Sequence, residues 1–325
     1  SVKLDDGWKT NAVICRPPKN KIDDVYIDAC RPNLLATIER LQPRVIVLLG
    51  MSAVKSLLPV EWERGVGNNL EKWLGWTIPS PRFKAWICPT YHPSYIKRMA
   101  EDPVLVRLTT EHLKRAFELE PKAPSTTSIK ALSRQIECID DPRAAYKRIS
   151  ALIGREGVLA FDYETTGLKP EAEGHKIVCC SFCLNGEDTF AAMLDDRCLS
   201  PLSKVLLNPR LKKIASNIKY EERWTRQFMG HGVAGWYWDT MLAAHVLDNR
   251  SGITSVKFQA YVLLGVPDYE SAVTQFLHTK YSNQINRIAK ADKRDLLLYC
   301  GIDSLVEYRV AEVQRRMMKC PGYSN

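Results

Sequence analysis

The first third of the chain alternates short apolar runs with helical patterns. A continuous apolar run at 44–50 lies between helical patterns at 23–41 and 51–58, and a further run at 85–90 follows. Fully apolar runs of this length are typical of strands buried on both faces, and their alternation with helices predicts a parallel sheet. We also expect a short strand at 11–15.

The composition changes abruptly near residue 118. Residues 118–128 are rich in Pro, Ser, Thr and charged side chains, which cannot build a hydrophobic core. We therefore expect one domain at 1–118, a linker at 119–128 and a second domain at 129–325. The whole chain is predicted to be α/β.

The second domain begins with a short strand and a helix and continues with further strands. Apolar runs at 157–164, 176–184 and 188–193 read as strands, and Asn185-Gly186 between the last two predicts a hairpin turn. Residues 211–217 form another predicted strand, which turns into a helix.

Two acidic residues follow the apolar run at 157–160. Alternate residues of a strand share a face, so Asp162 and Glu164 are predicted to point the same way. Two neighbouring carboxylates at the end of an apolar strand favour a bound divalent metal ion. The alternative is a solvated strand end carrying two unrelated acids.

Further polar residues of interest lie in or next to the predicted helices of the second domain. Glu221 lies in the helix that follows the 211–217 strand, and its neighbour Glu222 is expected to be solvated. Tyr299 and Asp303 are four residues apart in a helical pattern, so they share a face. Asp239 is read as a helix N-cap.

Charge and cysteine content narrow the classes of protein. The net charge of +9 and an isoelectric point near 9.0 favour a polyanionic partner, although solubility alone explains a modest surplus. The ten cysteines lack small-scaffold spacing, and no apolar run is long enough to span a bilayer. We expect a cytoplasmic protein, in a bacterium or a phage-infected host, with no membrane partner.

The first domain resembles the iron–sulfur (family 4) uracil-DNA glycosylases. The resemblance rests on the 10–18 segment with Asn11 and Cys15, on Cys30, on the 45–50 strand, on Arg64-Gly65, and on the loop with His92 and Ser94. It implies a parallel-sheet α/β/α sandwich in which Asn11 reads an extruded uracil and His92 stabilises an oxyanion. Cys15 and Cys30 would supply two of the four ligands of a 4Fe-4S cluster.

The resemblance of the first domain to these glycosylases is incomplete in its N-terminal part. The family's Gly-rich, acid-containing loop and its Cys-x-x-Cys pair are not found ahead of Asn11, so we expect a truncated or processed start. Two thiolates cannot hold a four-iron cluster by themselves. A DNA-binding relic is favoured over active glycosylase chemistry, and His92 is equally well read as an ordinary loop residue.

The second domain resembles the 3′-5′ exonucleases of the DEDD superfamily, in their tyrosine subtype. Asp162-x-Glu164, Asn217-x-Lys219-Tyr220-Glu221 and Tyr299-x-x-x-Asp303 match the three motifs in order and spacing. The resemblance implies a ribonuclease H-like fold with a mixed sheet and two divalent ions, Mg²⁺ or Mn²⁺. The implied ligands of the ions are Asp162, Glu164, Glu221 and Asp303.

The resemblance also implies roles for other residues. Tyr299 would orient the attacking water, Leu168 would wedge against the terminal base, and Asn217 and Lys219 would contact phosphate or the ion ligands. One departure stands out, because the second motif usually carries Asp where this chain has Glu221. Glu is longer by one methylene, and we expect weakened geometry rather than lost chemistry.

Together the two resemblances imply a proofreading-type enzyme acting in DNA replication. The expected substrate is a single-stranded or frayed DNA 3′ end, such as a primer–template end. The fusion resembles the front half of phage-type family A DNA polymerases, so a polymerase domain or subunit is an expected partner. RNase D-like trimming of RNA and a non-catalytic DNA-binding scaffold remain as alternatives.

Overall fold

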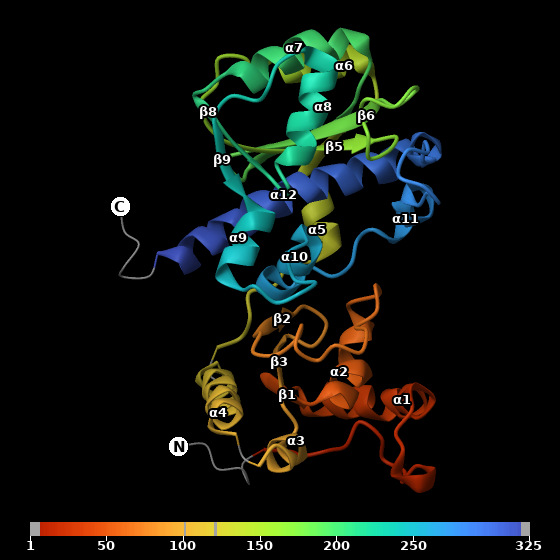
Figure 1. The fold of residues 1–325 in the computed structure, drawn as a ribbon, viewed down its shortest axis with the longest axis vertical. Helices are drawn as coiled ribbons and strands as arrows, with labels where there is room; N and C mark the ends of the chain where they lie inside the picture. Colours follow the sequence, from red (N-terminus) through yellow and green to blue (C-terminus); the bar gives the residue numbers. More distant parts are fainter. Residues whose placement is uncertain (1–6, 101, 120–121, 320–325) are drawn as a thin grey trace. The chain divides into compact units, whose positions relative to one another are not determined.

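The structure is a computed structural model that describes residues 7–100, 102–119 and 122–319 (Figure 1). The described residues form two compact units. The first is drawn from Ser1–Ser128 and Tyr261–Asp268, and the second from Ile129–Ala260 and Tyr269–Asn325. Residues 120 and 121 of the expected linker lie outside the described residues, as do 1–6, 101 and 320–325.

The first unit is built on a three-stranded sheet in the order β1-β3-β2. Strands β1 (Val45–Leu49) and β3 (Ala85–Thr90) pair in parallel, as their apolar runs predict, and β2 (Ile78–Ser80) adds an antiparallel strand. The helical segments of the unit are η2 (Pro18–Asn20), α1 (Asp24–Leu41), α2 (Met51–Leu57), η3 (Leu58–Val60), α3 (Pro93–Arg98) and α4 (Pro103–Glu118).

The strand expected at 11–15 does not form. These residues run as an irregular loop, and Ile14 is 59% exposed. A strand needs a neighbour to satisfy its backbone groups, and the three strands of this sheet pair only with one another among the described residues. A short apolar stretch without such a neighbour stays in the loop.

The second unit holds a six-stranded mixed sheet in the order β4-β7-β6-β5-β8-β9. Its strands are β4 (Ile136–Ile139), β5 (Gly157–Thr165), β6 (Ile177–Leu184), β7 (Asp188–Met193), β8 (Leu211–Ala215) and β9 (Trp236–Asp239). Strand β5 runs antiparallel to β6 and parallel to β8. The predicted hairpin at Asn185-Gly186 joins β6 to β7, and both turn residues have the positive φ that such a turn requires.

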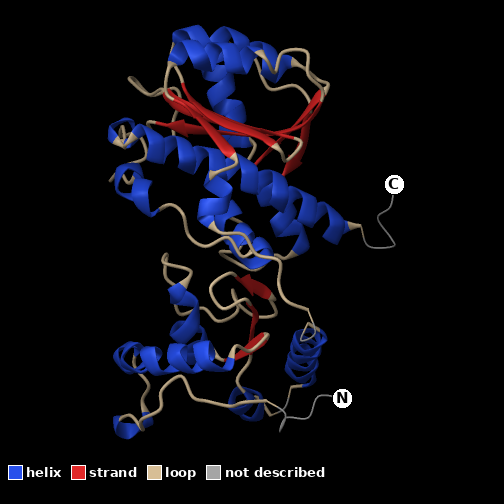
Figure 2. Ribbon diagram, turned by 180° about the vertical axis from the view of Figure 1, so that it is seen from behind, coloured by secondary structure: helices blue, strands red, loops and turns tan. Residues whose placement is uncertain are grey.

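Helices cover both faces of this sheet (Figure 2). The helical segments of the second unit are α5 (Ile129–Ser133), α6 (Pro142–Ser150), α7 (Asp196–Leu207), α8 (Lys219–Met229), α9 (Thr240–Leu247), α10 (Val256–Leu264, which ends among the residues of the first unit), α11 (Ser271–Leu277), η4 (Ile288–Lys290) and α12 (Lys293–Met318). Side chains of α6, α7 and α8 share one hydrophobic core with the sheet, and α12 packs against the opposite face.

Strand β5 shows how the alternation of side chains divides these two faces. Leu159, Phe161 and Tyr163 belong to the core shared with α6, α7 and α8. The intervening residues therefore face α12. Asp162 and Glu164 are among them, so the fold directs both carboxylates toward one long helix.

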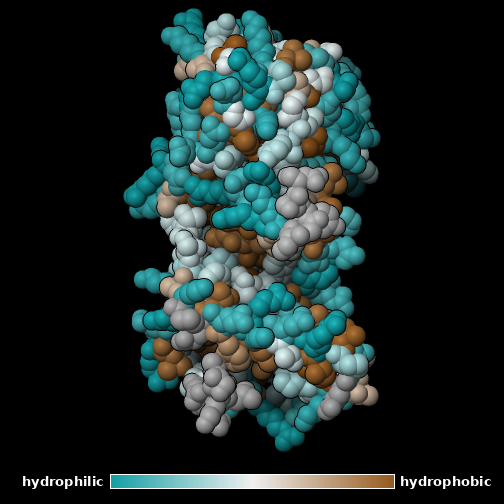
Figure 3. Space-filling view, turned by 90° about the vertical axis from the view of Figure 1, so that its left-hand side faces the viewer, coloured by the Kyte–Doolittle hydropathy of each residue, from teal (hydrophilic) through white to brown (hydrophobic). Residues whose placement is uncertain are grey.

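On the face shown in Figure 3, hydrophobic residues are interspersed among polar ones. Hydrophobic residues exposed in this scattered way are normal for a folded protein. Among the described residues, no helix combines the length and apolar character that crossing a membrane requires.

Candidate functional site

The structure brings Asp162 and Glu164 together beside α12. One ligand oxygen from each carboxylate and the Sγ atom of Cys300 all lie within 4.8 Å of one another. Glu164 is 7% exposed and Asp162 is half-buried. The alternative of two unrelated acids at a solvated strand end is therefore wrong.

Burial makes this pair of carboxylates costly as anions. It raises the pKa of Asp162 to about 8, and the negative charge of Asp303 contributes to the rise. It also raises the pKa of Glu164 well above its usual range, with Asp162 as the next cause. A bound cation would favour the charged carboxylates and remove this penalty.

The donor atoms fit a hard divalent cation. Carboxylate oxygens are the ligands that Mg²⁺ and Mn²⁺ prefer. Burial raises the pKa of Cys300 well above its usual range, so that side chain stays a thiol and is a poor ligand. The cluster is thus suited to Asp and Glu coordination rather than to a thiolate site.

Glu221, in the helix that follows β8, lies outside this group of three ligand atoms but at the same end of the sheet. Strands β5 and β8 are parallel, so residues that follow β8 lie at the same sheet edge as the end of β5. Glu221, in the first turn of α8, is 2% exposed, and its Oε2 has no hydrogen-bond partner among the described residues. Burial and the nearby charge of Asp162 raise its pKa well above the usual range.

The adjacent Glu222 has a structural role. Its carboxylate accepts hydrogen bonds from the Val233 amide and from Trp236 Nε1, each at 2.9 Å, and pairs with Arg226. The expectation of a solvated side chain is therefore wrong. Consecutive helical residues point in directions about 100° apart, which separates the roles of the two glutamates.

Tyr299 and Asp303 lie one turn apart on α12 and are 6% and 3% exposed. The Lys257 ammonium donates to the Tyr299 hydroxyl at 2.7 Å and to Asp303 Oδ2 at 3.0 Å. The Tyr269 hydroxyl donates to the other oxygen of Asp303. Both oxygens of the Asp303 carboxylate are therefore held in place by hydrogen bonds.

Sequence reasoning did not identify Lys257 or Tyr269. Lys257 lies in α10 and Tyr269 follows that helix, both more than 29 positions before Tyr299. Neither residue stands next to an acidic motif, and a lone Lys in a helix carries no sequence signal of a site. Their placement depends on how α10 and α12 meet.

The turn that positions Glu221 depends on a residue from β9. The Asp239 carboxylate accepts hydrogen bonds from the amides of Asn217 and Ile218 at 3.1 and 3.0 Å. Asn217 itself has φ of 65°, a left-handed conformation that Asn tolerates better than most residues. Asp239 also caps α9, as the sequence indicated, through the amides of Met241 and Leu242.

The loop after β5 presents Leu168 to solvent, with 59% of its surface exposed. Its neighbour Gly167 has no room for a side chain, because a Cβ there would lie 2.1 Å from His175. The Thr165 hydroxyl donates to the Gly167 carbonyl, and Tyr220 of α8 contacts both residues. The exposed leucine is therefore carried by a loop that is held close to α8.

The two polar residues predicted at the start of α8 differ in exposure. Asn217 is half-buried, and Lys219 is exposed. Both precede Glu221 by no more than four residues, so they lie at the same end of α8. Their role in contacting phosphate stays a prediction.

The polar residues predicted in the first unit lie on loops and helix ends. His92 caps the short helix α3, and its Nδ1 lies 2.7 Å from Ser94 Oγ and accepts from the Ser94 amide. Asn11 is exposed in the irregular 11–15 segment. Their roles in reading a base stay predictions.

The predicted cluster cysteines do not fit a four-iron cluster by themselves. Cys15 is exposed and Cys30 half-buried. Within the described ranges, neither cysteine belongs to a group of three or more metal-ligating side chains. A cubane cluster needs four ligands, so no chemistry is assigned to one here.

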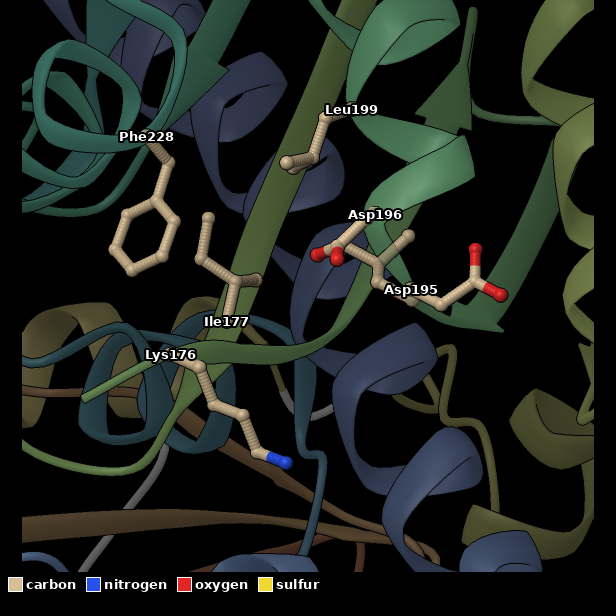
Figure 4. A pocket seen from close by; sticks show the side chains of 7 residues that line it. Lys176, Ile177, Asp195, Asp196, Leu199 and Phe228 are labelled. Carbon is tan, nitrogen blue, oxygen red and sulfur yellow. The ribbon is translucent and has the colours of Figure 1, made fainter. Parts of the chain in front are cut away.

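A separate pocket of about 260 Å³ lies elsewhere in the second unit. Figure 4 shows Phe228 and Ile177 side by side in its wall, together with Asp195 and Asp196. Asp195 caps α7 and pairs with Arg197. The carboxylate cluster around Asp162 contributes no residue to this pocket.

Comparison with known proteins finds a matching family model for part of each unit. A model of the uracil DNA glycosylase superfamily matches residues 7–119. Type-4 uracil-DNA glycosylases from Pyrobaculum aerophilum and Thermotoga maritima are both 33% identical to this chain, over 100 and 119 residues. These alignments cover 30% and 35% of the chain, and 50% and 57% of the relatives. The chain thus spans about half the length of the curated relatives it matches.

Two solved structures illustrate the similarity of the second unit to known folds. NrnC from Brucella melitensis matches with a TM-score of 0.42 and 16% identity, covering 61% of this chain and 84% of that one. RNase D from Escherichia coli matches with a TM-score of 0.42 and 14% identity, covering 58% and 46%. A model described as 3′-5′ exonuclease matches residues 134–318, more than half of the chain. The chain therefore belongs to the 3′-5′ exonuclease family.

Proposed function

We propose that the chain removes nucleotides from the 3′ ends of single-stranded or frayed DNA, with two divalent ions at the carboxylate cluster. The observation that carries the proposal is the closeness of the Asp162 and Glu164 carboxylates at the end of β5. Buried Glu221 of α8 supports it, because the charge of Asp162 contributes to the raised pKa of Glu221. Asp303 from α12 faces the same cluster, since its charge raises the pKa of Asp162.

The carboxylates divide into two ligand sets that share Asp162. Asp162, Glu164 and Asp303 would hold one ion, and Asp162 and Glu221 the other. When bound, the ions supply positive charge to the reacting phosphate and its attacking and leaving oxygens. Buried carboxylates suit this role because they are stable as anions only with a cation nearby.

Tyr299 positions the attacking water in this proposal. Its hydroxyl oxygen accepts from Lys257, so its own hydrogen is directed away from that ammonium. The hydroxyl can then donate to a water beside Glu164 and Asp303. Burial and the Asp303 charge raise the pKa of Tyr299 well above its usual range, which keeps the phenol protonated.

The 3′ end of the substrate would bind beside the carboxylate cluster. Leu168, exposed at the end of its tethered loop, packs against the terminal base. Exposed Lys219 and half-buried Asn217 lie at the N-terminus of α8 and contact the backbone phosphates. Contacts of this kind read the backbone and stacking faces, so little base preference is expected.

The match of residues 7–119 to a DNA-repair superfamily favours DNA over RNA as the substrate. We propose that the first unit contacts DNA in this role. If the substrate is a frayed DNA 3′ end, the exonuclease would act in proofreading, because frayed primer ends arise where a DNA polymerase works. We therefore also propose a DNA polymerase domain or subunit as its partner.

The test is digestion of 5′-labelled single-stranded DNA and RNA of the same sequence by the full chain, with Mg²⁺ or Mn²⁺ and then with excess chelator. We expect a 3′-end ladder on DNA that chelation abolishes. Asp162→Asn keeps the size of the side chain and removes its charge. We expect it to lower the rate at least about 10³-fold, which corresponds to several kcal/mol of lost stabilisation.

Circular dichroism supplies the control, because Asp162→Asn should keep the wild-type spectrum. Faster digestion of RNA would overturn the choice of substrate. Absence of metal-dependent shortening on either substrate would favour a DNA-binding scaffold.

A further inference from the structure

A fifth buried carboxylate lies one helical turn from Asp303, one of the four predicted by the motifs. Glu307 follows Asp303 by one helical turn on α12, and Tyr299, Asp303 and Glu307 share a face because they are spaced by four residues. Glu307 is 2% exposed, and its Oε2 has no hydrogen-bond partner among the described residues. A buried carboxylate of this kind needs a counter-charge or a proton.

The surroundings of Glu307 are those of the metal cluster. The negative charges of Asp162, Glu221 and Asp303 all act on it and, after burial, contribute most to the rise of its pKa. Lys257 acts in the opposite direction, but its ammonium is hydrogen-bonded to Tyr299 and Asp303. Glu307 therefore faces three anions, and the nearby cation is already engaged.

Glu221 and Glu307 both carry a buried carboxylate oxygen without a hydrogen-bond partner in the described part of the chain. Each side chain is 2% exposed, and the oxygen concerned is Oε2 in both. The two glutamates come from two different helices, α8 and α12. An unpaired buried acceptor costs about 1–3 kcal/mol, and more when it is charged, so two such carboxylates with electrostatic influence on each other favour a cation-binding site.

We infer that Glu307 is a ligand, directly or through one water, of the ion shared by Asp162 and Glu221. This inference rests on the proposed function and adds a residue that the three motifs do not contain. It gives the second ion three carboxylates from three different elements. The extra carboxylate also offsets the departure at Glu221, because a second side chain would then help to hold the ion.

The competing explanation is a protonated Glu307 that contributes nothing to metal binding. Glu307→Gln distinguishes a metal-binding Glu307 from a protonated one, because an amide has the same shape as the protonated acid but binds metal ions more weakly than a carboxylate. The experiment titrates Mn²⁺ into the full chain without nucleic acid and follows free Mn²⁺ by electron paramagnetic resonance. We expect two ions in the wild type, with the weaker one lost or bound at least about tenfold more weakly in Glu307→Gln.

Glu312→Gln is the matched control on the same helix. Glu312 is partly exposed and pairs with Arg315, and its substitution should leave both ions unchanged. Thermal unfolding gives a second measurement, in which Mn²⁺ should raise the melting temperature less for Glu307→Gln than for the other two proteins. Equal Mn²⁺ binding by Glu307→Gln and the wild type would overturn the inference.

A second substitution covers the case in which Glu307→Gln does not fold. Glu307→Asp keeps the negative charge but shortens the side chain by one methylene group, which moves the carboxylate away from the ion. We expect severalfold weaker binding of the second ion. Unchanged binding by this variant would also overturn the inference. The readout is metal binding without substrate, so a wild type that binds two ions and digests nothing would count against the proposed function alone.

Discussion

At the scale of single residues, the site is defined by charges that burial makes unstable. Asp162, Glu164 and Glu221 all have raised pKa values, and desolvation is the largest cause for each. Lys257 partly offsets this by placing a cation on Asp303. A site poised in this way favours entry of a divalent cation, because the cation removes the repulsion among the carboxylates.

Lys257 has two effects that a substitution can separate. Lys257→Met removes the donor to Tyr299 and Asp303, and it also removes a positive charge that competes with metal ions. We expect turnover to fall about 10- to 100-fold, since partners that orient ligands have effects of this size. We expect Mn²⁺ to bind more tightly, because the carboxylates lose a competing cation.

Single-turnover digestion and Mn²⁺ titration measure these two effects. Lys293→Met, at an exposed lysine at the start of α12, is the control and should change neither. A loss of both turnover and Mn²⁺ affinity in Lys257→Met would contradict this account.

At the scale of elements, the position of Glu221 depends on a cap from outside its own helix. Helix α8 has no side-chain N-cap of its own, and Asp239 at the end of β9 binds the amides that lead into it. The same carboxylate caps α9. One side chain therefore couples the starts of two helices, and only one of the two carries a predicted ligand.

Asp239→Ala should cost more activity than its effect on stability suggests. The lost cap of α9 costs about 1 kcal/mol, and the released turn allows Glu221 to move. A displacement of about 1 Å at a catalytic group can lower a rate about 100-fold. We expect a 10- to 100-fold slower digestion, measured beside the midpoint of urea unfolding.

Asp141→Ala provides the matched comparison. Asp141 caps α6 through the Ala144 amide at 2.9 Å, on the far face of the sheet from the carboxylates. It should lower the urea midpoint by a similar amount and leave digestion within about twofold of the wild type. Equal rates for the two variants would show that Asp239 acts only as a cap.

At the scale of the whole molecule, the two units carry different chemistry. The predicted exonuclease residues belong to the second unit, and His92 with Ser94 belongs to the first. His92→Ala removes a helix cap and a hydrogen bond to Ser94, both local to α3. We expect exonuclease digestion within about twofold of the wild type, measured on labelled single-stranded DNA.

A uracil-containing strand of the same DNA tests the first unit in that experiment. Asp162→Asn serves as the reciprocal control, since it should abolish digestion and leave any DNA binding by the first unit intact. A large loss of digestion in His92→Ala would mean that the two units act on one substrate path.

Much of the second unit could be read from the sequence because its signals are local. The 157–164 run, the Asn185-Gly186 turn and the four-residue spacing of Tyr299 and Asp303 each depend on neighbours in the chain. The segment at 11–15 shows the limit, since strand formation needs a partner strand that no local pattern reports. The different roles of Glu221 and Glu222 could be told apart only once the orientation of α8 was known.

The sequence by itself determined the fold class, most strands of the second unit and the face of β5 on which Asp162 and Glu164 lie. Strand alternation and helical spacing follow from backbone geometry, and so are already present in the order of residues. Only the tertiary structure decided that Lys257, Tyr269 and Glu307 join the cluster. Their contacts arise where α10 and α12 pack around the end of β5, and such packing brings together residues whose separation in the chain carries no pattern.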